Sequence, residues 1–295
     1  MRSPRICARV FRRRNARRAR TSRFCHVTCR FAPPAAEHQS MAQLLRGSVW
    51  IGRCLGIRVG IHPSWLLVFA LVVWMLTNSF ADLGGEHALA LAVVTALAFF
   101  GSVVVHEFAH ALVARRFGVA TLSIRLFLFG GVATIATEPP SPGAEAAIAF
   151  AGPLCSAVLA GACGLGLEIV GHLGGEPHLA LLLMALAAAN AVLAAFNLLP
   201  AFPMDGGRIL RATVWRLRGD HAAATRLSSL AGMGFALALG LMGVGLAWHT
   251  HRWEPLWYLA LGGFISIATI QSYQQACCKT AVGGSEAASQ RKPAA

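Results

Sequence analysis

The chain alternates between long apolar stretches and short polar segments, a pattern typical of a protein that crosses a membrane several times. Apolar runs near the length of about 20 residues needed to span hydrocarbon lie at residues 64–81, 88–114, 144–170, 179–199, 227–248 and 256–272. We therefore predict an all-α polytopic membrane protein with about six transmembrane helices.

The arginines between these runs predict its orientation. They gather in alternate connections, at Arg115, Arg116 and Arg125 after the second run and at Arg208, Arg211, Arg216 and Arg218 after the fourth. Loops rich in Lys and Arg stay in the cytoplasm. We therefore expect an integral membrane protein with both termini and the Arg-rich loops in the cytoplasm.

Residues 120–137 do not fit a simple loop between the second and third helices. The stretches "LSIRLFLF" and "VATIAT" flank Gly130 and Gly131 in the manner of a two-residue β-hairpin. Non-helical backbone is tolerated at membrane depth only where it is buried in protein or lines a wet cavity. The sequence predicts a membrane-associated hairpin at a cytoplasmic cavity, with a hairpin lying at the headgroups as the alternative.

Composition agrees with a membrane protein, since 56% of the residues are hydrophobic, 13% are charged and the mean hydropathy is +0.59. The net charge of +14 is concentrated in residues 1–40, where eleven Arg and the single acid Glu37 give +10. We expect this segment to be a disordered leader, acting as a membrane-surface or nucleic-acid arm, or sequence upstream of a true start at Met41. The membrane domain is predicted over residues 41–275 and a disordered cytoplasmic tail over 276–295, with no direct nucleic-acid partner for the whole.

Three ionisable residues, His106, Glu107 and His110, interrupt the second apolar run. Such groups are costly inside a membrane and mark function. Side chains four residues apart share a helix face, so both imidazoles can reach one metal ion, with the glutamate beside them. The motif HEFAH therefore predicts a zinc site in which Glu107 acts as general base on a water molecule.

A catalytic zinc takes three protein ligands and keeps a position open. Asp205, in "NLLPAFPMDGGRIL", lies near the cytoplasmic end of the fourth run, where Pro200 and Pro203 must break the helix. HEFAH lies at the same level. We predict Asp205 as the third ligand of one zinc ion per chain, with Gly206 and Gly207 allowing a tight turn and with Arg208 either orienting the carboxylate or binding a headgroup phosphate.

Between Gly47 and Gln275 the chain resembles the site-2 protease family of intramembrane zinc metalloproteases, in its compact six-helix bacterial and archaeal branch. The resemblance rests on HEFAH and "NLLPAFPMDGGR", supported by "GIRVGIHPSWLLVF", "LFLFGGVA" and "AFAGPLCSAVLA". It implies a metalloendopeptidase of the bacterial plasma membrane with the same ligands and base. It assigns to Asn197 the polarisation of the scissile carbonyl or the stabilisation of the oxyanion. Many relatives carry a pair of nucleotide-sensing domains after the last helix, which the short sequence beyond residue 275 does not lead us to expect.

The family further implies cleavage of a transmembrane substrate helix near its cytosolic face, as in regulated intramembrane proteolysis. Its expected partners are the lipid bilayer and a single-span membrane protein, such as an anti-sigma factor or a membrane-tethered transcription regulator. A metal-ion transporter and a catalytically silent membrane scaffold remain the alternative functions.

Other polar residues receive structural interpretations. We expect His62 to lie at the membrane interface and Asn190 to form an interhelical hydrogen bond. Glu138 and Glu145 are expected to be solvated. The small residues of "AFAGPLCSAVLAGACG" are expected to permit close helix packing.

Overall fold

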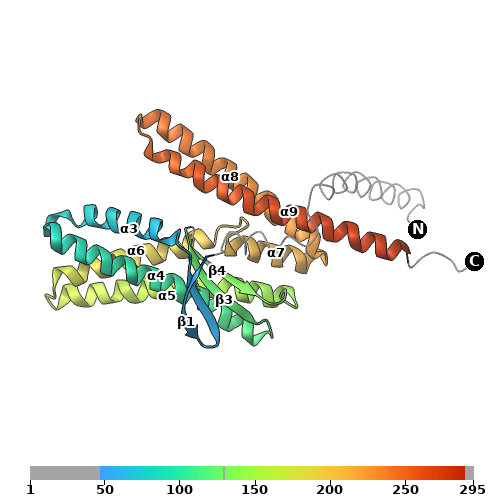
Figure 1. Ribbon diagram of the computed structural model, residues 1–295, viewed down its shortest axis with the longest axis horizontal. Coiled ribbons are helices and arrows are strands. Elements are labelled where there is room, and N and C mark those ends of the chain that lie inside the picture. Colours follow the sequence, from blue (N-terminus) through green and yellow to red (C-terminus); the bar gives the residue numbers. More distant parts are fainter. Residues whose placement is uncertain (1–46, 129, 290–295) are drawn as a thin grey trace, which may run out of the picture.

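The computed structural model describes residues 47–128 and 130–289, including side chains except at 254 and 278–289. The leader predicted for residues 1–40 lies outside this part. The helices are α3 (Trp65–Ser79), α4 (Gly85–Arg116), α5 (Pro142–His172), α6 (Pro177–Asn197), α7 (Asp205–Arg218), α8 (His221–Thr250) and α9 (Trp257–Ser289), with 3-10 turns η1 (Ala81–Leu83) and η2 (Glu254–Leu256). Figure 1 shows α3 to α6 gathered as one bundle, from which the α8–α9 pair diverges beyond α7.

The helical membrane architecture agrees with the prediction. Within the described residues, the helices α4, α5, α6 and α8 are long and apolar enough to cross a membrane. α3 has 15 residues and is shorter than a typical span. α9 does not belong to this set either, so a count of six spans stays a prediction.

The short helix α7 was not expected, because residues 205–218 were interpreted as an Arg-rich loop. Its polar and apolar residues alternate with a helical period, and both Ala212 and Val214 are buried. Gly219 ends it in the left-handed conformation at φ +68°. The Asp220 side chain then caps α8 by accepting a 3.0 Å hydrogen bond from the Ala223 N–H.

A four-stranded sheet lies beside the helices, in the order β1 (Val49–Cys54), β2 (Ile57–Ile61), β3 (Thr121–Phe127) and β4 (Gly130–Ile135). The β1–β2 and β3–β4 pairs are antiparallel and β2 pairs with β3 in parallel. The sequence prediction included only the second hairpin. A buried cluster of Ile57, Ala111 and Ile124 packs one face of the sheet on α4.

The turn of the second hairpin differs in place from the prediction. Phe127 pairs with Gly130, so Gly130 and Gly131 begin β4 and do not form the turn. The physical reason lies at Gly131, where a Cβ atom would come within 2.6 Å of the Glu107 Cγ. Glycine is therefore needed there for a close approach of strand and helix.

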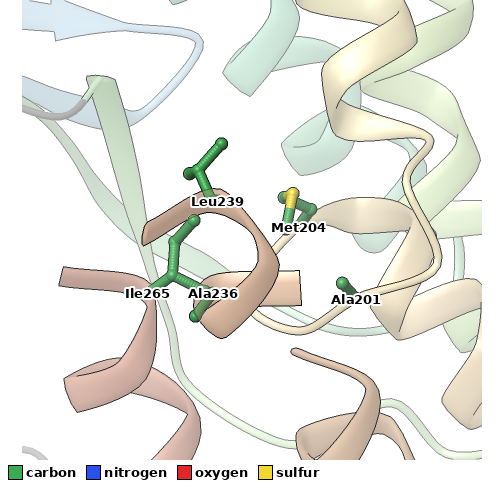
Figure 2. Close-up of a cluster of buried hydrophobic side chains, with 5 residues drawn as sticks. All are labelled: Ala201, Met204, Ala236, Leu239 and Ile265. Atoms are coloured by element: carbon green, nitrogen blue, oxygen red, sulfur yellow. The ribbon is translucent and has the colours of Figure 1, made fainter. Parts of the chain in front are cut away.

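The segment before α7 is held by α8 and α9. Ala201 and Met204 of this segment form a buried apolar cluster with Ala236 and Leu239 of α8 and with Ile265 of α9. Figure 2 shows these side chains and the elements that supply them. The cluster fixes the chain just ahead of Asp205.

The helix α9 continues to Ser289, through residues that were predicted as a disordered tail from 276 onward. No proline stands between Trp257 and Ser289 to interrupt the helix. Residues 290–295 lie outside the described part, and the disordered tail over 276–295 stays a prediction.

Candidate metal centre

The HEFAH motif lies in the C-terminal half of α4. His106 and His110 are buried on one helix face, with their Nε2 atoms 3.1 Å apart and their rings edge to face. One turn of helix between the two residues produces this geometry. The Nε2 atoms of His106 and His110 therefore point at one common position.

Asp205 joins them from the first turn of α7. Its Oδ2 atom lies 3.1 Å from the His110 Nε2 and 3.4 Å from the His106 Nε2. Arg208 approaches the other oxygen, Oδ1, at 3.6 Å, which agrees with the predicted orienting role. The structure thus brings together three residues separated by 95 positions in the chain, all of them buried.

Gly206 and Gly207 allow this placement, but not through a turn. Both lie inside α7. A Cβ on Gly206 would collide with the Leu198 carbonyl, and one on Gly207 with the backbone at Ala201 and Phe202. The two glycines therefore let α7 pack onto the backbone that follows α6, which sets the position of Asp205.

Helix α5 orients both imidazoles through contacts with their Nδ1 atoms. The His110 Nδ1–H donates a 2.7 Å hydrogen bond to the Ile148 carbonyl, and the His106 Nδ1 lies 2.9 Å from the Ser156 Oγ. A carbonyl only accepts, so the His110 proton is fixed on Nδ1 and its Nε2 lone pair is free for a ligand bond. Pro153 interrupts the α5 hydrogen bonds in this stretch.

Gly152, also on α5, leaves space at the ligand atoms. A Cβ atom built on Gly152 would overlap the Nε2 atoms of both His106 and His110. The space in front of these nitrogens exists because this position lacks a side chain. A side chain of any other residue type would occupy it.

The donor set fits zinc. Two imidazole nitrogens and one carboxylate oxygen are common ligands of catalytic zinc. Ligands about 2.0–2.1 Å from a tetrahedral ion lie roughly 3.3 Å from one another, and the three separations here are 3.1, 3.1 and 3.4 Å. His106, His110 and Asp205 are therefore suited to hold the ion.

The charge state of Asp205 also suits a ligand. Burial alone would raise the pKa of this carboxyl, but the close imidazoles of His106 and His110 and the nearby positive charge of Arg208 outweigh it. The resulting pKa lies well below the ordinary value for aspartate. The carboxylate therefore stays ionised at neutral pH, as metal binding requires.

Glu107 lies between the metal-binding face and the sheet. It is half-buried, and the first residues of β4 pack against its side chain at Gly131. The predicted base thus has the metal centre on one side and a strand on the other. A substrate segment lying along that strand would pass close to its carboxylate.

The other polar residues discussed from the sequence make hydrogen bonds away from the metal-binding side chains. Among the described contacts, the Asn197 Nδ2 donates to the Leu193 carbonyl at 3.0 Å, and no contact joins Asn197 to the metal-binding side chains. His62 bonds to Ser64. Asn190 donates to Leu186 of its own helix, while its buried Oδ1 has no partner in the described part, so the expected interhelical bond is not formed.

Glu145 is fully buried, contrary to the expectation that it is solvated. Its carboxylate forms an ion pair with Arg211 of α7, which donates from Nε at 2.6 Å. A charge can be buried when it is paired in this way. The pair fastens the start of α5 to the helix that begins with Asp205.

Sequence reasoning missed the supporting residues Gly152, Ser156 and Ile148. The segment "AFAGPLCS", which contains Gly152 and Ser156, was interpreted as a surface for close helix packing. A glycine and a serine four residues apart, flanking a proline in a membrane helix, were the available signal. The carbonyl of Ile148 gave none, because any residue supplies a carbonyl.

Comparison with known proteins agrees with this geometry. Residues 94–173 and 176–241 match Peptidase family M50. The chain is 38% identical over 213 residues to the putative zinc metalloprotease sll0528 of Synechocystis sp., an alignment that covers 68% of this chain and 54% of that protein. It is 39% identical over 210 residues to the putative zinc metalloprotease Rip3 of Mycobacterium tuberculosis, covering 69% and 52% respectively.

A solved structure is also similar. The site-2 protease from Methanocaldococcus jannaschii is 29% identical and superposes with a TM-score of 0.52, covering 77% of this chain and 95% of that one. The chain spans about half the length of the curated relatives described above. The residues that match the family model include both HEFAH and the segment that ends in Asp205.

Proposed function

The chain belongs to Peptidase family M50, the site-2 protease family of integral membrane proteins, and from this premise we propose that it is a zinc-dependent intramembrane endopeptidase. The observation that carries the proposal is the buried group of His106, His110 and Asp205, with Glu107 beside it. Polar groups at such depth require a compensating interaction. A bound metal ion provides it.

In the proposed mechanism one zinc ion per chain is held by His106, His110 and Asp205. When bound, zinc polarises a carbonyl and increases the acidity of water. Glu107 accepts the proton from the attacking water and delivers it to the leaving amine. Ser156 and the Ile148 carbonyl keep the two imidazoles oriented through the reaction.

Asn197 is proposed to bind the oxygen of the scissile carbonyl as negative charge develops on it. It is the last residue of α6, immediately before the segment that leads to Asp205. Its amide now donates to the Leu193 carbonyl. A rotation of the side chain away from its own helix would free the N–H groups for substrate.

The proposed substrate is a single-span membrane protein, cut near the cytosolic face in regulated intramembrane proteolysis. Anti-sigma factors and membrane-tethered transcription regulators are the expected class. Support for the inner position comes from Arg115 and Arg116, which end α4 only a few residues after His110. On the same rule we propose that both termini lie in the cytoplasm of a bacterial cell.

A helical substrate must unwind before its amides can be attacked, and β4 offers a place for the unwound segment. β4 is the terminal strand of the sheet within the described residues. The Ala136 N–H donates to the Ala120 carbonyl on the β3 side. Since alternate residues of an antiparallel strand face opposite ways, the N–H groups of Ile135 and Ala133 point to the free edge. We propose that substrate adds there as a further strand.

Replacing Ala133 with proline should reduce cleavage about five- to tenfold, because it deletes one N–H on the free edge while leaving the bonds to β3 intact. The loss of one hydrogen bond in a buried substrate complex is worth about 1 to 1.5 kcal/mol. The measurement is the rate of cleavage of a reconstituted single-span substrate.

Ala133→Val is the matched control, since it keeps the N–H and adds similar bulk. The valine variant should cleave at close to the original rate. Equal rates for the proline and valine variants would exclude strand addition on β4 without affecting the proposed metal chemistry.

Metal removal tests the proposed function itself. Purified protein reconstituted with a single-span substrate should lose cleavage when zinc is removed with a chelator and recover it when one equivalent of zinc is returned. Metal flux across sealed vesicles, measured in parallel, separates a protease from a transporter. Flux without any peptide cleavage would favour the transporter and contradict the proposal.

A further inference from the structure

The β1–β2 hairpin exposes an apolar tip. Leu55, in the turn, has a relative exposure of 60%, and Cys54 beside it is an exposed free thiol. Farther from the turn, Ile51 and Val49 of β1 have relative exposures of 64% and 65%. Every residue of β1 is exposed. Apolar side chains exposed along one protruding hairpin indicate a surface that is covered by something else.

The turn at this tip holds a residue that its backbone disfavours. Cys54 pairs with Ile57, so Leu55 and Gly56 form a two-residue turn, with φ angles of +53° and +85°. Two positive φ angles favour Asn followed by Gly. Leucine is rare in this conformation, so a strained and exposed Leu55 points to a function for its side chain.

The face of the hairpin that looks away from α4 is basic. Arg53 lies directly opposite Arg58, an arrangement in which like charges repel. Arg125 of β3 lies beside Gly60 on the same face, and its guanidinium stacks over the Trp50 ring at 5.0 Å. None of these arginines forms an ion pair within residues 47–128 and 130–289.

No acidic residue occurs in the strands of this sheet that could neutralise the arginines. The Nε of Arg125 is buried without a hydrogen-bond partner in the described part of the chain. An external anion would reduce the electrostatic repulsion between the facing guanidinium groups of Arg53 and Arg58. Phosphate groups suit arginine because they accept paired, charge-assisted hydrogen bonds.

The place of the hairpin favours lipid as the source of these phosphates. Ile57, on the opposite face, packs against Ala111 of α4, so the arginines face away from the bundle. Figure 1 shows the hairpin projecting to the side of the α3–α6 bundle, across the direction of its helices. α4 ends close by, at the basic residues Arg115 and Arg116, which mark the inner membrane surface.

We propose that the β1–β2 hairpin is a lipid anchor in the inner leaflet. Leu55 and Ile51 insert among the acyl chains, and Arg53 and Arg58 bind the phosphates of anionic headgroups. The lipid covers the apolar tip and offsets the repulsion between the two arginines. The sheet, and with it the β4 strand beside Glu107, is thereby held at a fixed depth.

The exposed Cys54 allows a direct test. In a variant whose other cysteines are replaced, Cys54 is labelled with an environment-sensitive fluorophore, and the full chain is placed in nanodiscs of phosphatidylcholine, with or without phosphatidylglycerol. We expect a nitroxide near the top of the acyl chain to quench the probe several times more strongly than a water-soluble quencher. Phosphatidylglycerol should increase this difference and high salt should decrease it.

Two variants keep the test independent of folding. Leu55→Asn suits the turn better, so it should raise the melting temperature while reducing acyl-chain quenching severalfold. Arg53→Gln with Arg58→Gln should remove the dependence on phosphatidylglycerol, whereas the control Arg216→Gln with Arg218→Gln on α7 should not.

Quenching only from water, equal in both lipid mixtures, would overturn the proposal. Shielding of the probe only after addition of a substrate peptide would also overturn it and would identify the hairpin as a protein-docking surface. Neither outcome bears on the proposed protease chemistry, because the hairpin supplies none of the metal-binding or catalytic residues.

Discussion

Gly152→Ala is expected to abolish zinc binding and with it all proteolysis. The added methyl group would overlap the Nε2 atoms of both His106 and His110, the two nitrogens that face the metal position. Loss of a supporting group around a metal typically reduces metal affinity 10- to 100-fold. A methyl group that fills the metal position should reduce zinc affinity by more than about 100-fold. Zinc content measured by mass spectrometry on purified protein checks the prediction.

Gly161→Ala provides the matched control. Gly161 lies on the same helix, and a Cβ there would meet nothing within 4 Å. Alanine is the better helix former by roughly 0.5–1 kcal/mol, so this variant should retain zinc and be equally or more stable. A Gly152→Ala protein that still holds one zinc per chain would show that the ion lies elsewhere.

Glu107→Gln should reduce cleavage by about 10²- to 10⁴-fold, the range for loss of a general acid–base group, while zinc content remains unchanged. Glutamine has the shape of glutamate but cannot accept a proton from water at neutral pH. Its side chain still fits against Gly131 of β4, so the strand next to it should keep its place. The measurement combines single-turnover cleavage of a reconstituted substrate with metal analysis.

Glu168→Gln serves as the control because Glu168 is exposed near the end of α5, far along the helix from the metal-binding residues. It should cleave normally. If Glu107→Gln lost its zinc, Glu107 would be a ligand rather than the base, and if it cleaved at the original rate the proposed proton transfer would be wrong. Both results differ from that expected for Gly152→Ala, where metal and activity disappear together.

The sequence by itself determined the features that depend on local spacing or on transfer between water and lipid. Apolar run lengths placed the long helices, because the hydrocarbon thickness sets the number of residues. The i, i+4 spacing put His106 and His110 on one face. Because burying these histidines is costly, we predicted a metal ion and chose Asp205, a rare acid at the same expected membrane level, as its third ligand. The structure brings Asp205 to the two histidines.

The sequence was less informative where a residue acts through its neighbours in space. The sequence contains a strand-like alternation in "VWIGRCLGIRVGI" and a helical one in "RILRATVWRLR", yet neither β1–β2 nor α7 was predicted from them. Short helices and strands gain most of their stability from tertiary packing. Their local sequence patterns therefore do not distinguish them from loops. The partner of Glu145 could not be foreseen, because Arg211 lies 66 positions away.

Only the tertiary structure decided what the glycines of the centre do. From sequence, Gly131 looked like part of a turn and Gly152 like a helix-packing residue. In the folded chain each faces a functional side chain that another segment supplies, Glu107 in one case and the two histidines in the other. The absence of a side chain has meaning only relative to what fills the space, and that is set by the packing of segments far apart in the chain.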